Sequence, residues 1–210
     1  MIDPSKFEKL NVADTCSIWN VLASRLLHGA AKSAQVSFCL TEFVRYECLV
    51  KPGQMRPERL ELQNRLKREI QAGSVMPCRI EIEDLQDVGI LESRRRVSKG
   101  ELSSIVFAKK SQQAFMTDDR KAASLARTIV AADKVQSTPQ LLAWLFYIGR
   151  LQDSDKDAIT RELIALSRNL QPHLDNAYVE ALRCRLMSHT SQGAVAVPDP
   201  TDKYPSPTRN

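Results

Sequence analysis

The sequence predicts an α/β fold in which a parallel sheet is flanked by helices, with extra helices towards the C-terminus. Short apolar segments that suit buried strands alternate with longer amphipathic segments that suit helices. Each connection between neighbouring parallel strands needs a crossover, which is usually a helix. The clearest example is residues 98–126, where a helix, a short apolar strand and a second helix follow one another.

The N-terminal half is expected to hold three strands, each followed by a helix. Strands are predicted from β-branched and aromatic content, and helices from apolar residues at helical spacing and from capping residues. In order, the expected elements are a strand at 12–13, a helix at 15–27 that His28 and Gly29 end, a strand at 34–40, a helix at 42–50 that Thr41 caps, a charged helix at 54–71, a strand at 75–82 and a helix leading into Arg94.

The central segment carries the strongest local signals. Ser98 and Glu101 form the S-x-x-E pattern of a capping box, and the helix they begin ends in Lys109 and Lys110, as helix C-termini prefer. The apolar run at 114–116 then suits a buried strand. It stops at Thr117, Asp118 and Asp119, where the next helix is expected to begin.

After the central segment the sequence predicts mostly helices. Residues 126–135 offer a strand at most, and Ser137 followed by Pro139 marks the start of an apolar, central helix that Gly149 ends. Two amphipathic helices are expected at 153–170 and 176–187. We therefore expect one domain at 1–152, a helical extension of it at 153–187, and a disordered tail at 188–210, where Ser, Pro, Gly and Thr dominate.

Composition predicts a soluble, cytoplasmic protein. The 210 residues are 43% hydrophobic and 26% charged, with neither a membrane-spanning apolar run nor the apolar region of a signal peptide. The five cysteines are scattered and never in C-x-x-C spacing, so we expect reduced thiols and no zinc site. The net charge of +5 permits a nucleic-acid partner without requiring one.

Acidic residues follow two predicted strands and begin a predicted helix. Because the carboxyl ends of parallel strands meet at one edge of a sheet, Asp14, Glu101 and the pair Asp118 and Asp119 are expected to converge. Glu47 lies inside its helix among apolar neighbours, which is unusual for a surface carboxylate. Gathered carboxylates repel unless a cation neutralises them, and hard oxygen ligands suit Mg²⁺ or Mn²⁺. The chemistry predicted is metal-assisted hydrolysis of a phosphodiester.

Four motifs give the chain a family resemblance over roughly residues 10–150. V-A-D-T at 12–15, T-E-F-V-R-Y-E at 41–47, K-G-E-L-S-S-I-x-x-A at 99–108 and M-T-D-D-R-K-A at 116–122 resemble the PIN domain, a family of metal-dependent ribonucleases that includes many toxins of bacterial toxin–antitoxin pairs. The stretch at 53–99 is longer than compact members have, and the helices after 153 are additional.

The resemblance implies a set of site residues. The family's acidic quartet matches Asp14, Glu47, Glu101 and Asp119, with Asp118 as a substitute or helper, because T-D-D leaves the choice between the two aspartates open. Asp14, Glu101 and Asp119 would be the metal ligands. The supporting and nucleic-acid-binding residues expected beside them are Thr15, Thr117, Arg94, Arg95, Arg96 and Lys99.

The resemblance also implies partners, and each of its residues has a second interpretation. RNA is the expected substrate, with single-stranded DNA as the other possibility, and an antitoxin, another regulatory protein or self-association would restrain such a nuclease. Taken singly, Asp14, Glu101, Asp118 and Asp119 also suit helix caps. The alternative function is a catalytically silent PIN-like module that binds protein or nucleic acid within a larger assembly.

Overall fold

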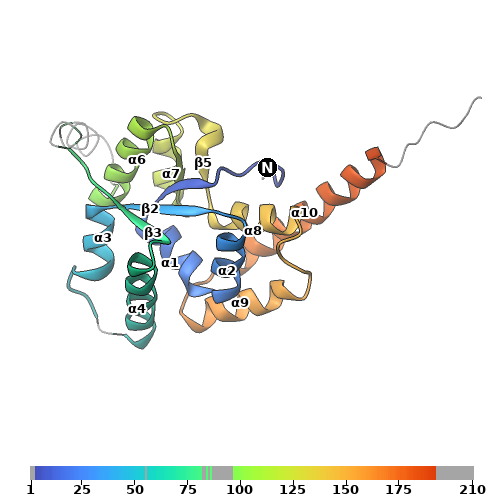
Figure 1. Ribbon diagram of the computed structural model, residues 1–210, viewed down its shortest axis with the longest axis horizontal. Helices are drawn as coiled ribbons and strands as arrows, with labels where there is room; N and C mark the ends of the chain where they lie inside the picture. Colours follow the sequence, from blue (N-terminus) through green and yellow to red (C-terminus); the bar gives the residue numbers. More distant parts are fainter. Residues whose placement is uncertain (1–2, 55, 82–83, 85, 87–96, 193–210) are drawn as a thin grey trace, which may run out of the picture.

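The sheet has five parallel strands in the order β3-β2-β1-β4-β5 (Figure 1). The computed structural model describes residues 3–54, 56–81, 84, 86 and 97–192. The strands are β1 (Leu10–Ala13), β2 (Ser37–Thr41), β3 (Val75–Cys78), β4 (Ala114–Met116) and β5 (Val135–Gln136). The prediction of a parallel sheet flanked by helices is confirmed, and β1 lies at its centre between β2 and β4.

Helices cover both faces of this sheet. The described helices are α1 (Thr15–Ala23), α2 (Arg25–Ser33), α3 (Glu42–Leu49), α4 (Pro57–Gln71), α6 (Lys99–Ser111), α7 (Arg120–Ala126), α8 (Thr138–Tyr147), α9 (Asp155–Ala165) and α10 (Gln171–Gln192). Val12 and Phe115 pack into a core with α6 and α7 on one face. Their strand neighbours Ala13 and Met116 pack into a larger core with α1, α2, α4 and α8 on the other. Side chains alternate between faces along a strand, so two adjacent residues serve two cores.

The helix expected at 15–27 is in fact two helices, which corrects the prediction. α1 ends at Ala23, and Ser24 has extended backbone angles and accepts a hydrogen bond from Leu27 N at 3.1 Å through Oγ. A serine side chain competes with the helix for backbone donors, which favours it at N-caps over helix interiors. Gly29 therefore lies inside α2 and does not end a helix.

Several other helices and strands begin or end a few residues away from the predicted positions. α4 begins at Pro57 and not at 54, because Pro suits the first turn of a helix. β3 ends at Cys78, and the helix expected to lead into Arg94 falls outside the described residues. The segment at 126–135 holds turns and a short 3₁₀ helix (Ala132–Lys134) before the two-residue β5. The apolar helix after Ser137 is confirmed: Ser137 caps α8, which lies in the core.

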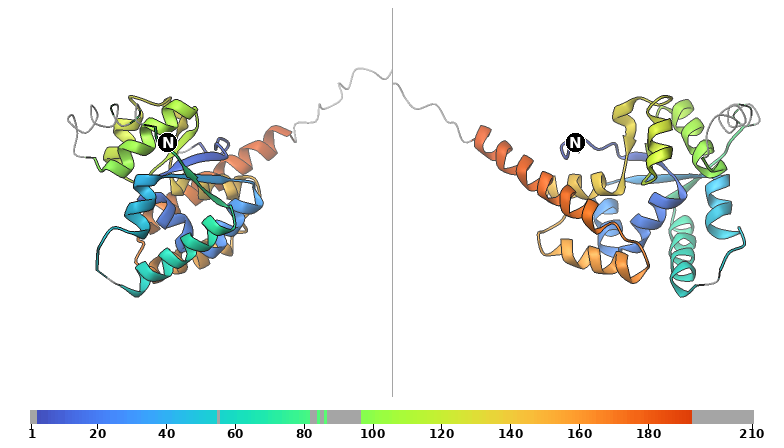
Figure 2. Two further views of the ribbon diagram at one scale, coloured as in Figure 1. Left: turned by 60° about the vertical axis from the view of Figure 1, so that its left-hand side comes forward. Right: turned by 180° about the vertical axis from the view of Figure 1, so that it is seen from behind.

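Of the two C-terminal helices, α10 covers α8, and α9 packs against α1 and α2. Ile159 of α9 is fully buried, and Tyr178 of α10 packs edge-on against Phe146 of α8 with ring centroids 4.9 Å apart. α10 runs to Gln192, past the expected start of the tail at 188, and its end projects from the body (Figures 1 and 2). Val179 and Leu186 on α10 are 59% and 70% exposed. Among the described helices, none is long and apolar enough to cross a membrane.

The expectation that all cysteines are reduced thiols is wrong for one pair. Cys39 on β2 and Cys78 on β3 form a disulfide, with their Cα atoms 6.0 Å apart. The parallel register places Cys78 opposite Thr41, two residues beyond Cys39, so both side chains lie on one face of the sheet. Cys16, Cys48 and Cys184 are free thiols. The 39-residue separation of the pair carries no sequence signal, since only strand pairing makes the two residues neighbours.

Candidate active site

Asp14 and Thr117 join the ends of the two central strands. Asp14 follows β1 and Thr117 follows β4, and these strands pair in parallel. Asp14 N donates to Met116 O at 3.1 Å, and Thr117 Oγ1 donates to Asp14 Oδ2 at 2.5 Å. The carboxyl edge of the sheet therefore brings Asp14 beside the segment that carries the two other aspartates, Asp118 and Asp119.

Asp14 is a buried carboxyl group with few favourable partners. Its side chain is the N-cap of α1, where Oδ1 accepts from Ser17 N at 2.7 Å, and the residue is 1% exposed. Burial raises the pKa of Asp14 from 3.8 to about 7, and the nearby charge of Asp118 adds to the increase. The hydrogen bonds from Thr117 and Ser17 oppose it. Ionised Asp14 would be stabilised by a nearby cation.

The raised pKa predicts how stability depends on pH. Because folded Asp14 holds its proton more tightly than unfolded Asp14, its contribution to stability is fully present below pH 3.8 and is lost as pH rises to about 7. The loss is at most about 4 kcal/mol. Urea denaturation of metal-free protein between pH 4 and 8 should show this decline, and Asp14→Asn should remove it. Parallel curves for parent and variant would contradict the assigned pKa.

The two adjacent aspartates have different surroundings. Asp118 accepts three hydrogen bonds, from Asn20 Nδ2 at 2.6 Å, from Thr138 N at 2.8 Å and from Thr138 Oγ1 at 2.5 Å. It thereby ties α1 and the start of α8 to the end of β4. Asp119 caps α7 through Oδ1 alone, which accepts from the backbone amides of Lys121 and Ala122. The described residues donate no hydrogen bond to Asp119 Oδ2, so this oxygen is the better placed to take a ligand.

Glu47 lies between α1 and the start of α6. Thr15 Oγ1 donates to Glu47 Oε2 at 2.7 Å, and Thr15 directly follows Asp14. A Cβ atom added at Gly100 would lie 2.6 Å from the same Oε2, so the first turn of α6 approaches the carboxylate as only glycine allows. A helix N-terminus favours a carboxylate there. Thr15 therefore holds the Glu47 carboxylate by a hydrogen bond next to Asp14 in the chain.

Glu101 makes the capping box that its sequence predicts. Its Oε2 accepts from Ser98 N at 2.8 Å, and its own amide donates to Ser98 Oγ at 3.2 Å. In the described part of the chain no hydrogen bond joins Glu101 to Asp14, Glu47 or Asp119. Lys99 begins the same helix. The predicted nucleic-acid-binding residues Arg94, Arg95 and Arg96 lie outside the described residues.

Two surface depressions reach these residues from different sides. Thr117, Asp118 and Asp119 line a groove of about 1010 Å³ that α7, α8 and the start of α10 border. Glu47 and Lys99 line a second depression of about 550 Å³ together with aromatic side chains of α3. Asp14 lines neither depression, but it accepts a hydrogen bond from Thr117, which lines the larger one. The larger groove is therefore the wider route from solvent to the end of β4.

The carboxylates fit a hydrated Mg²⁺ better than a cation held by protein ligands alone. Across residues 3–54, 56–81, 84, 86 and 97–192, no three His, Cys, Asp or Glu side chains lie close enough to form a metal site. Mg²⁺, however, is commonly held by one or two carboxylates and keeps several waters. Buried Asp14 and Asp119 Oδ2 offer hard oxygen donors of this kind. The donor chemistry fits Mg²⁺ or Mn²⁺.

Several residues of the site escaped the sequence analysis. Asn20, Thr138 and Ser17 hold Asp118 and Asp14 in place, and Gly100 makes room for Glu47. None belongs to the residue types that a search for acidic clusters selects. Gly100 was the exception, because a glycine within a helix is unfavourable and indicates that another group packs closely against it.

Comparisons with protein-family models, curated proteins and solved structures found no match to this chain. The α/β architecture therefore rests on the structure itself, and no family is assigned from it.

Proposed function

We propose that this protein is a PIN-like, divalent-metal-dependent nuclease that hydrolyses phosphodiester bonds, with single-stranded RNA as its substrate. One observation carries the proposal: a buried carboxyl group, Asp14, ends the central strand beside Thr117, with Asp118 and Asp119 at the end of the adjacent strand. The raised pKa of Asp14 supports it, because such a group is stabilised as an anion by a cation.

Asp14 and Asp119 would hold the metal, and Glu101 would contribute through one of the metal-bound waters without breaking its capping box. A bound Mg²⁺ or Mn²⁺ supplies an activated water and stabilises charge on the phosphate. The residues of this chain position the reactants: Thr117 orients Asp14, and Thr15 orients Glu47. Glu47, with Thr15 between it and Asp14, would accept a proton from the attacking water. Lys99 and Arg94–Arg96 would contact the phosphate backbone.

A nuclease assay tests the proposal. Labelled single-stranded RNA and single-stranded DNA are incubated with the full chain in Mg²⁺, in Mn²⁺ and in EDTA. We expect cleavage of RNA with either metal and none in EDTA. Cleavage in EDTA, or no cleavage of either substrate with metal, would contradict a metal-dependent nuclease.

A catalytically silent PIN-like module is the second candidate, because Glu101 is held in its capping box. Replacing Glu101 with Gln separates the two, since Gln also completes a capping box and should leave stability within about 0.5 kcal/mol of the parent. For the nuclease we expect Mn²⁺ affinity, measured by calorimetry, to fall at least roughly tenfold. Unchanged Mn²⁺ binding would make Glu101 a helix cap alone.

Gly100→Ala should damage the site without damaging the fold. Ala is favoured over Gly in a helix by about 1 kcal/mol, but its Cβ would displace the Glu47 carboxylate from Thr15. We expect cleavage to fall at least roughly tenfold, with stability equal to the parent or higher. Ser111→Ala is the matched control: Ser111 lies at the opposite end of the same helix, away from Glu47, and Ala is also the better helix former there, so cleavage should stay unchanged. Equal rates for both variants would remove Glu47 from the mechanism.

A restraining partner belongs to the same proposal, whether an antitoxin, another regulatory protein or a second copy. The exposed Val179 and Leu186 on α10 support it, since α10 covers α8 with its other residues. Light scattering of the purified protein measures self-association. The same measurement on protein purified from its host detects bound partner proteins. A monomer that retains no host protein would count against it.

A further inference from the structure

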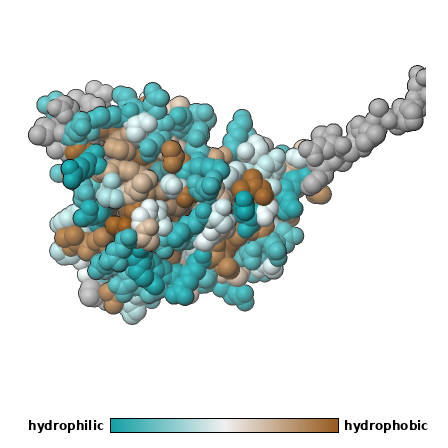
Figure 3. Space-filling model, in the orientation of Figure 1, coloured by the Kyte–Doolittle hydropathy of each residue, from teal (hydrophilic) through white to brown (hydrophobic). Residues whose placement is uncertain are grey.

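A basic pocket lies between α2 and α4, built from residues outside the proposed active site. It encloses about 530 Å³, and its polar lining consists of Arg25, His28, Lys32, Arg65, Arg68 and Glu69. Hydrophilic side chains dominate the surface over α4 (Figure 3). Within the pocket, the Arg65 side chain is only 16% exposed.

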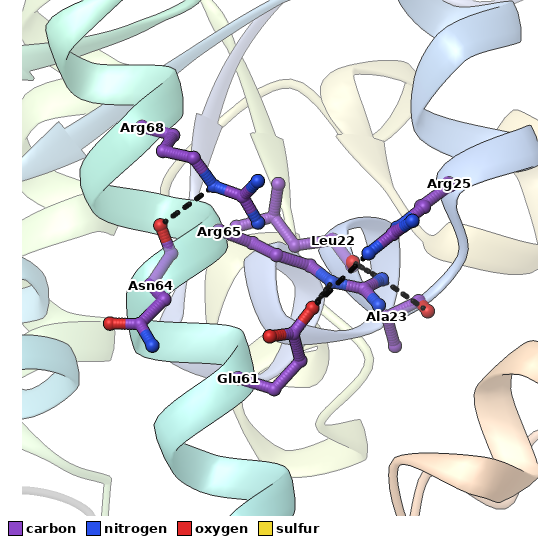
Figure 4. Close-up of polar contacts among 7 residues, drawn as sticks. All are labelled: Leu22, Ala23, Arg25, Glu61, Asn64, Arg65 and Arg68. Atoms are coloured by element: carbon purple, nitrogen blue, oxygen red, sulfur yellow. Dashed lines mark hydrogen bonds and ion pairs between the residues drawn. The ribbon is translucent and has the colours of Figure 1, made fainter.

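Arg65 lines this pocket and is held in place by three hydrogen bonds. Its Nε donates to Glu61 Oε1 at 2.7 Å, and its Nη1 donates to Leu22 O at 2.9 Å and to Ala23 O at 3.0 Å. These carbonyls are at the C-terminal end of α1, where a cation is favourable. Figure 4 shows the guanidinium groups of Arg25 and Arg68 on either side of Arg65. A fixed guanidinium between two more exposed ones is pre-organised for an anion.

The positive charges in the pocket exceed the negative charges around it. One carboxylate, that of Glu61, lies near Arg25, Arg65 and Arg68. The hydrogen bond from Arg65 is the main cause of its lowered pKa, and the other two arginines lower this pKa further. Arg25 Nη2 lies 3.5 Å from Glu61 Oε1, and among the described residues Arg68 makes one hydrogen bond, to Asn64 O at 3.4 Å. The remaining pair, Lys32 and Glu69, is in contact at 3.0 Å. Gathered guanidinium groups repel one another, so a bound anion would stabilise the arrangement.

His28 supplies an independent observation. It is 9% exposed, it lines the pocket, and its Nε2 is buried without a hydrogen-bond partner among the described residues. Glu69 Oε2 is 3.8 Å away, beyond hydrogen-bond distance. A buried, unsatisfied ring nitrogen costs free energy unless something outside the protein completes its bonding. An oxygen of a ligand in the pocket would do so.

We propose that this pocket binds a phosphate group, carried either by a free phosphorylated molecule or by the backbone or end of a nucleic acid. Planar guanidinium groups match the oxygens of phosphate in paired hydrogen bonds, and Lys32 adds a point charge. His28 Nε2 donates to a further phosphate oxygen. The site would operate whether or not the protein is a nuclease, since it shares no residue with the carboxylate cluster.

The test measures phosphate binding by calorimetry on the full chain and its variants. Inorganic phosphate is the first probe, and the titrations are run at low ionic strength, where charge-mediated binding is strongest. We expect Arg25→Gln and Arg68→Gln each to weaken binding at least about fivefold. Lys67→Gln is the matched control, because Lys67 is an exposed cation on the same helix outside the pocket. The phosphate affinity of the Lys67→Gln protein should match that of the parent.

Two further probes distinguish the sources of the phosphate. An oligoribonucleotide with a 5′-phosphate and the same oligoribonucleotide without it are titrated in EDTA, which prevents metal-dependent cleavage. Tighter binding of the phosphorylated form indicates an end phosphate, equal and Arg68-dependent binding of both indicates the backbone, and binding of inorganic phosphate alone indicates a small ligand. Failure of all three probes to bind, or equal binding by parent, Arg25→Gln and Arg68→Gln, would overturn the proposal.

Discussion

Asp14→Asn should lower the rate of metal-dependent RNA cleavage at least about 100-fold while the protein stays folded. Asparagine preserves the shape of the side chain, caps α1 as well as aspartate does, and can donate to Thr117 Oγ1 in place of accepting from it. Removing the negative charge, however, removes the buried anion that would neutralise the metal. Single-turnover cleavage of labelled RNA in Mg²⁺ measures the loss.

Asp133→Asn is the matched control for this variant. Asp133 is an exposed carboxylate that lines the same groove as Asp118 and Asp119, so its replacement removes one negative charge near the site and leaves the buried carboxyl group of Asp14 in place. We expect its cleavage rate to match that of the parent. A folded Asp14→Asn protein with the parent's cleavage rate would refute the assignment of Asp14 to the site. Equal losses in both variants would point to the charge of the groove and not to a ligand.

The two adjacent aspartates should separate into a structural and a functional residue. Asp118→Ala would leave the three donors from Asn20 and Thr138 without their acceptor, and we expect it to cost about 3 kcal/mol of stability. Asp119→Ala should cost only about 1 kcal/mol, the usual value for a helix cap. Cleavage should nevertheless fall further for Asp119→Ala, at least about 100-fold, because its Oδ2 would hold the metal.

Urea denaturation and cleavage assays on both variants measure these effects. The comparison is made at a temperature where the Asp118→Ala protein remains folded, so that unfolding does not lower its rate. If Asp118→Ala loses cleavage completely and Asp119→Ala retains it, the ligand is Asp118 and the roles are reversed. The T-D-D sequence left this choice open, and the hydrogen bonds to Asp118 now favour Asp119 as the ligand.

The sequence alone determined the features that depend on neighbours in the chain. The capping box of Ser98 and Glu101, the strand at 114–116 and the helix cap at Ser137 are all present as predicted. Each arises from residues within about one helical turn of one another, so local propensity and backbone geometry decide them. The alternation of apolar strands with helices also implied a parallel sheet, because parallel connections require crossovers.

Only the tertiary structure decided the features that join distant segments. Hydrogen bonds join Asp118 to Asn20, 98 residues away in the sequence, and Thr15 to Glu47, 32 residues away. The disulfide joins Cys39 to Cys78, which are separated by 39 residues. Strand order sets these neighbours, and many orders satisfy the same pattern of strands and helices. Which aspartate keeps a free oxygen, and which arginines share one carboxylate, follow from that order and from packing. Long-range contacts of this kind depend on the whole fold, because no short segment contains both partners.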